Sequence, residues 1–233
     1  MFDKQVYMDR RTELKKNFKT GVILFLGNDE SAMNYPGNTY AFRQDSSFLY
    51  YFGLDVPNMV GLIDIDENKE ILFGHEFSVE DIVWMGPQPK LAQLAEQIGV
   101  AQTESIDTLK KYLKSKISKQ IKIHFLPTYR GDQTLKLADL VDENPYKLKS
   151  KFSKKLIEAV VAQRSVKGEE EVAEIEYAME IAYQMHTTAM RMAKPGVIER
   201  DIAGAIEGIA LSLGSGVSFG AIVSKNGQTL HNH

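Results

Sequence analysis

The spacing of hydrophobic and polar residues predicts alternating helices and strands over the first 150 residues. Sparse apolar positions among lysines and arginines indicate a helix within residues 1–20, which ends at Gly21. An apolar run predicts a buried strand at 22–26, and further strands are predicted at 60–65 and 121–126. A turn pairs the strand at 60–65 with 70–73 as a hairpin. Helical spacing predicts two further helices, through Leu91, Leu94, Ala95 and Ile98 and through Leu109, Leu113 and Ile117. This order indicates an α/β or α+β domain with a mixed sheet.

The pattern becomes helical after about residue 165. One apolar stripe predicts a long helix that stops at 194–196, and a second helix follows and ends at Gly214. The alternation in 217–230 predicts a strand, a turn at 225–227 and the start of another strand. These elements either pack on the first domain or belong to a domain that the chain does not complete. We favour the second, because their apolar stripes need a partner layer.

Composition excludes several classes of protein. The 233 residues carry a formal net charge of -3, which gives no basic face for nucleic acid. The absence of cysteine rules out disulfides, a cysteine zinc site, an iron–sulfur cluster and a thiol nucleophile. The longest apolar runs have about five residues, far below the roughly 20 that cross a bilayer. The polar start does not resemble a signal peptide, so we expect no membrane partner and a cytoplasmic protein.

Three histidines have simple structural interpretations. His75 precedes a glutamate but begins no HExxH motif, because position 79 is Val, and we expect a polar loop there. His124 lies within a predicted strand and His186 beside the apolar stripe of the long helix. Packing accounts for both.

Two other features are candidates for function. Trp84, the only tryptophan, lies in 82–87, which the pattern predicts to be an exposed strand that runs into a turn. His231 and His233 lie at alternate positions of a predicted strand, and their side chains would therefore point to one side. Such a pair suits the binding of a metal or a substrate.

Four segments together resemble a known family. Residues 38–53 contain an Arg-Gln-x-Ser-x-Phe-x-Tyr-x-x-Gly pattern, and 164–171 contain Arg-x-x-Lys-x-x-x-Glu. Residues 194–199 contain Pro-Gly-x-x-Glu, and 226–231 read Asn-Gly-x-x-Leu-His. In this order, the segments resemble the N-terminal half of a proline-specific aminopeptidase of the aminopeptidase P type, in the creatinase/prolidase/methionine-aminopeptidase group.

The resemblance implies two domains. Residues 1–160 would form the N-terminal domain, a mixed sheet flanked by helices. Residues 161–233 would begin the α+β pita-bread catalytic domain with its first helices and hairpin. In that family the ligands of a dinuclear metal site, Mn²⁺ or a similar ion, all follow the Leu-His motif. We therefore expect no metal ligand and no cofactor in this chain, and no peptidase activity from it alone.

The resemblance also implies roles for individual residues. The intact protein would hydrolyse the bond between an N-terminal residue and a following proline, with two metal ions activating a water. His231 would bind the substrate and stabilise the tetrahedral intermediate, whereas His233 would act only indirectly. Trp84 would bind substrate at the mouth of a neighbouring subunit's active site, in a homo-oligomer formed through the N-terminal domain. Arg43, Gln44 and Asp45 would brace that domain.

Two alternatives remain open. The chain could belong to a pita-bread relative without metal ligands that acts as a binding module. It could instead belong to a prolidase that is restricted to dipeptides, or to a creatinase-like hydrolase that needs no metal. Trp84 and the 43–53 segment favour the aminopeptidase P type.

Overall fold

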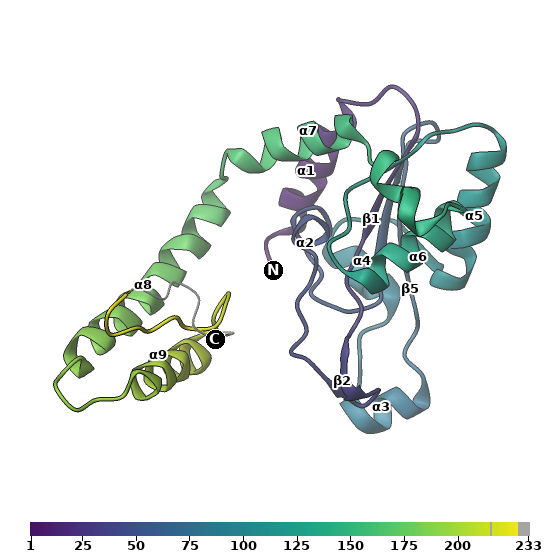
Figure 1. Cartoon of the computed structure of the whole chain (residues 1–233). Coiled ribbons are helices and arrows are strands. Elements are labelled where there is room, and N and C mark those ends of the chain that lie inside the picture. The colour runs from purple at the N-terminus through teal and green to yellow at the C-terminus, as the bar shows by residue number, and fades with distance from the viewer. Residues whose placement is uncertain (215, 228–233) are drawn as a thin grey trace. The chain divides into compact units, whose positions relative to one another are not determined.

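The structure, a computed structural model, describes residues 1–214 and 216–227. The chain divides into two compact units, Met1–Val166 and the residues from Lys167 onward (Figure 1). The boundary expected from the sequence, at residue 160, falls within a helix of the first unit, Lys154–Ser165. The assignment of 1–160 and 161–233 to two domains stays a prediction.

A five-stranded mixed sheet forms the centre of the first unit. Its order is β6-β5-β4-β1-β7, with β1–β4 and β4–β5 antiparallel and the outer pairs β5–β6 and β1–β7 parallel. The strands are β1 Val22–Leu26, β4 Val60–Asp64, β5 Lys69–Gly74, β6 Gln102–Ser105 and β7 Ile123–Phe125. A separate small hairpin joins β2 Ala32–Tyr35 to β3 Asn38–Thr39. The predicted mixed sheet and its central hairpin are confirmed.

Helices cover both faces of this sheet. One core contains Ile23 and Phe25 of β1 and is covered by α1 Lys4–Lys15, α2 Ser46–Phe52, α4 Leu91–Gln97 and α7 Lys154–Ser165. The other core contains Val22 and Leu24 and is covered by α5 Ile106–Ser118, α6 Gly131–Val141 and the 3₁₀ helix η1 Pro145–Ser150. Side chains alternate between the faces of a strand, and a strand buried on both faces therefore reads as one unbroken apolar run.

A buried arginine joins α1 to three other elements. The Arg11 side chain is fully buried and donates to the carboxylate of Glu70 on β5 (Nε–Oε2 2.7 Å). It also donates to the carbonyl oxygens of Tyr51 on α2 and Ile98 after α4, each at 2.8 Å. These charge-assisted bonds compensate for burying the guanidinium.

His124 is a buried core histidine, as the sequence predicts. It is 5% exposed, and its Nδ1 lies 2.7 Å from the Ser153 hydroxyl. Burial, assisted by the charges of Lys122 and Lys155, lowers the pKa of His124 to about 4.

The second unit contains two helices, as predicted: α8 Glu169–Met192 and α9 Glu199–Leu213. The Tyr177 hydroxyl of α8 donates to the Leu213 carbonyl at the end of α9 (2.9 Å). Residues 216–227 form no strand, which differs from the predicted hairpin. The physical reason is that backbone N–H groups of this segment donate to α9 carboxylates: Ala221 to Glu207 at 2.9 Å, and Lys225 to Glu199.

Replacing Arg11 with alanine should destabilise the chain by about 3 kcal/mol, because the carbonyl groups of Tyr51 and Ile98 lose this donor and Glu70 keeps only Lys15. Urea unfolding followed by far-UV circular dichroism measures the change. The control is Lys16→Ala, which removes an exposed ion pair with Glu13 and should cost less than about 0.5 kcal/mol. Equal effects of the two substitutions would contradict the anchoring role of Arg11.

Stability should also fall with pH because of His124. The unfolded chain binds a proton near pH 6.5, whereas the folded chain resists it until about pH 4. The contribution of His124 is therefore complete above pH 6.5 and declines as the pH falls, by about 2 to 3 kcal/mol between pH 6.5 and 4.5. Urea unfolding at several pH values should show a smaller decline for His124→Asn than for the unchanged chain. Parallel declines would contradict the assignment.

Candidate functional site

The Gln44 side chain is the centre of the 43–53 segment. It is 4% exposed and uses both ends of its amide. Oε1 accepts from the backbone N–H groups of Asn28 (2.7 Å) and Asp45 (2.8 Å). Nε2 donates to the carbonyl oxygens of Leu54 (3.2 Å) and Val56 (2.9 Å). Gln44 therefore joins the loop after β1 to the loop after α2.

Asp45 and Gly53 define the ends of α2. The Asp45 carboxylate accepts from the N–H groups of Ser47 and Phe48 at 2.9 Å, as an N-cap. Gly53 ends the helix at φ 65°, where a side chain would overlap the ring of Tyr7 (2.2 Å). The expected bracing role agrees with these contacts of Gln44 and Asp45.

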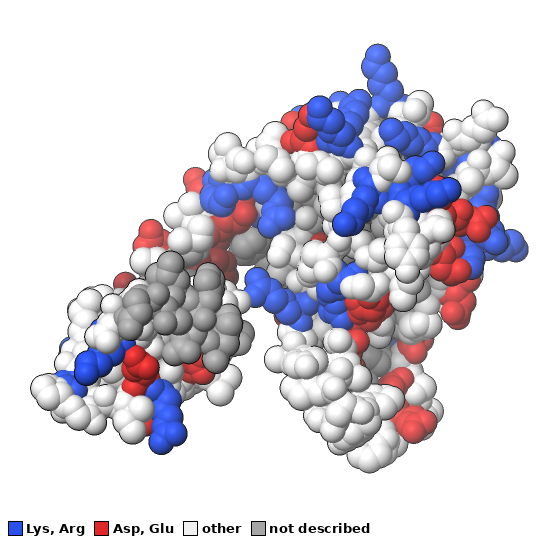
Figure 2. Space-filling model, viewed as in Figure 1, with Lys and Arg blue, Asp and Glu red and all other residues white. Residues whose placement is uncertain are grey.

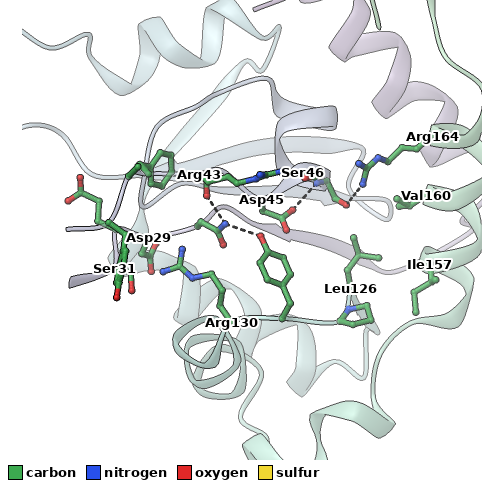
Figure 3. A pocket seen from close by; sticks show the side chains of 18 of the residues that line it. Asp29, Ser31, Arg43, Asp45, Ser46, Leu126, Arg130, Ile157, Val160 and Arg164 are labelled. Atoms are coloured by element: carbon green, nitrogen blue, oxygen red, sulfur yellow. Dashed lines mark hydrogen bonds between the residues drawn. The ribbon is translucent and has the colours of Figure 1, made fainter. Parts of the chain in front are cut away.

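A cleft of about 780 Å³ lies beside this segment (Figure 3). Its walls come from the loops after β1 and β7, from 40–47 and from α7. The strands β1 and β7 are parallel, so their carboxyl ends meet at one edge of the sheet, where α/β proteins commonly bind ligands. No pattern in the sequence indicated this cleft, because its walls are distant along the chain.

Hydrogen bonds fix the walls of the cleft. The Asn28 amide donates to the Arg43 carbonyl (2.8 Å) and to the Tyr129 hydroxyl (3.0 Å). Arg164 of α7 donates to the Ser47 hydroxyl at 3.1 Å (Figure 3). Arginines and carboxylates both line the cleft, which suits a ligand with charges of both signs.

Trp84 lies in a helix, α3 Val79–Met85, and the predicted strand at this position is wrong. The Ser78 hydroxyl accepts from the Asp81 N–H (3.1 Å) and the Asp81 carboxylate accepts from the Ser78 N–H (2.7 Å). This capping box is a helix start signal that was present in the sequence. The β-branched apolar residues of the helix indicated a strand instead.

The apolar side chains of α3 face solvent. Trp84 is 82% exposed, and Val79, Ile82, Val83 and Met85 are also exposed. Figure 2 shows a mostly uncharged surface over β2 and α3. Contiguous exposed apolar surface of this kind marks interaction sites. His231 and His233, the other candidate residues, lie outside the described residues.

Two family profiles match the chain in succession. The profile of the aminopeptidase P N-terminal domain matches residues 7–124, just over half of the 233 residues. The chain belongs to the aminopeptidase P family. The profile of metallopeptidase family M24 matches 173–233.

Curated relatives and solved structures agree with this membership. A probable Xaa-Pro aminopeptidase of Sordaria macrospora is 25% identical over 91% of this chain and 36% of its own length. Human Xaa-Pro dipeptidase is 28% identical over 86% of this chain and 41% of its own length. The chain thus spans about two fifths of these relatives. Proline aminopeptidase P II of Yersinia pestis shares the fold, with a TM-score of 0.75 and 20% identity over 92% of this chain and 51% of that one.

The M24 family name implies a divalent metal. Within 1–214 and 216–227, no three His, Asp or Glu side chains gather as a metal site would require. The described residues therefore do not fit the metal, and its identity stays a prediction. None of the described helices is long and apolar enough to cross a bilayer, and the cytoplasmic location also stays a prediction.

Replacing Gln44 with leucine should destabilise the chain by about 3 kcal/mol or more, because it removes four hydrogen bonds from a buried site. Gln44→Glu should also destabilise it, since a carboxylate would face the carbonyl oxygens of Leu54 and Val56. Thermal unfolding of both variants, beside the exposed control Gln97→Leu, tests this role. A melting temperature of Gln44→Leu equal to that of the control would refute it.

Proposed function

We propose that this chain is the N-terminal portion of a metal-dependent Xaa-Pro aminopeptidase, which releases the residue that precedes proline. The succession of an aminopeptidase P N-terminal domain and an M24 segment in one chain carries the proposal. The names of the relatives support a proline-specific peptidase. The chain alone should be inactive, because its described residues supply no ligand set for the metal.

In this proposal, α3 contacts a second copy of the protein. Burial of Trp84, Val83 and Val79 would remove from water an apolar surface that is costly to leave exposed. The Trp84 indole would stack on proline at the neighbour's active site, for which its flat apolar face is suited. His231 keeps its proposed role in stabilising the tetrahedral intermediate, and this role rests on the Leu-His motif alone.

A dipeptidase is the second candidate. Human Xaa-Pro dipeptidase is among the relatives, with 28% identity over 207 residues. The two candidates differ in whether the substrate continues after proline. A tripeptide and a dipeptide of the same first two residues therefore discriminate between them.

The full-length protein should release alanine from alanyl-prolyl-alanine with Mn²⁺, and chelation should abolish the release. Trp84→Ala should raise KM about tenfold with little change in kcat, because stacking on proline is lost. It should also shift the oligomer toward monomer in sedimentation velocity. In the 233-residue chain, where Trp84 is the only tryptophan, its fluorescence should move to the blue when copies associate.

Tyr146→Ala, on an aromatic residue of η1 that is 94% exposed, is the matched control and should leave both readouts unchanged. Cleavage of alanyl-proline but not of the tripeptide would favour the dipeptidase. No cleavage of either by a folded, metal-loaded protein would favour the binding module.

A further inference from the structure

A buried amide without a partner lies next to the cleft. Gln133, in the first turn of α6, is 4% exposed, and neither its Nε2 nor its Oε1 has a hydrogen-bond partner. Burial of an unpaired amide opposes folding, and an apolar residue of the same size would avoid that cost. The side chain therefore points to a function that packing does not supply.

Gln133 lines a small cavity of about 40 Å³. The cavity is adjacent to the cleft and shares six lining residues with it: Asn28, Asp45, Leu126, Pro127, Tyr129 and Arg130. Its volume suits two or three waters, which is also about the number of heavy atoms in one amide group. Leu24, Phe125 and Leu137 form apolar walls around it.

Polar groups at the entrance favour a carboxylate. The Tyr129 hydroxyl accepts from Asn28 and so keeps its own hydrogen for another acceptor. Arg130, at the N-cap of α6, donates from Nε and Nη2 to the Asp132 carboxylate (3.2 and 2.6 Å), and its remaining guanidinium N–H groups can donate to a ligand. The carboxylate of Asp29, also in the lining, is already paired with Lys136 at 2.9 Å.

We propose that the cavity and the cleft together bind a short peptide with a free C-terminal carboxylate. A peptide group of the ligand pairs with Gln133, because its N–H and C=O match the free acceptor and donor of the side chain. The carboxylate contacts Tyr129 and Arg130. The choice of a peptide, rather than another molecule with an amide and a carboxylate, rests on the proposed function.

Calorimetric titration of the 233-residue chain with alanyl-prolyl-alanine, in the presence of chelator, tests this site. The unchanged chain and the exposed control Gln97→Leu should bind the peptide saturably. Gln133→Leu should bind the peptide with a Kd about tenfold higher. A peptide of the same sequence with an amidated C-terminus should show a similar rise in Kd on the unchanged chain. The melting temperature of Gln133→Leu should not fall, because an unpaired buried amide is removed.

Tyr129→Phe provides a second variant at an exposed residue and should also weaken binding. Absence of saturable binding at millimolar peptide, or equal binding by Gln133→Leu, would overturn the inference. Ordered water would then be the hydrogen-bond partner of the Gln133 amide. The measurement involves no turnover. Hydrolysis by the full-length protein without binding here would refute this site alone, and binding without hydrolysis would refute the proposed peptidase alone.

Discussion

The position of the cleft depends on one buried guanidinium. Arg11 holds the carbonyl groups at the ends of α2 and α4 and the carboxylate of Glu70 on β5 at the same time. Because α2 is fixed at its end by Arg11 and at its start by Asp45, the preceding residues have little freedom. Gln44 then joins those residues to the loop after β1. One charge in the interior thus determines, through α2, where a wall of the cleft lies.

Much of the fold could be predicted because the central strands are buried on both faces. Burial of that kind favours apolar residues on both faces, and the runs at 22–26 and 60–63 show it directly, whereas the buried Asp64 pairs with Lys116. α3 was assigned incorrectly because it is exposed and apolar, so that no buried face imposes a helical period. The sequence analysis did not predict α7, because only two of its residues, Leu156 and Val160, are buried and they leave a weak apolar spacing.

The candidate sites were predictable only in part. A motif marked Gln44 and Asp45, but it does not contain the partners of Gln44, such as the carbonyl group of Val56. Gln133 carries no signal in the sequence at all, since an unpaired glutamine differs from a solvated one only in its surroundings. The cleft joins residues near 28, 45, 129 and 164, which tertiary structure alone brings together.

The pairing of β1 with β7 constrains how the chain is made. β1 pairs with β4, which begins about forty residues later along the chain, whereas its other partner, β7, begins only at Ile123. At 5–20 residues per second, the ribosome needs on the order of 3 to 12 s to synthesise the segment between β4 and β7. During that interval the apolar strand β1 has an unpaired edge, which is a template for association with other chains. A nascent chain that pauses between β4 and β7 would therefore depend most on chaperones, although the finished sheet has β1 in its interior.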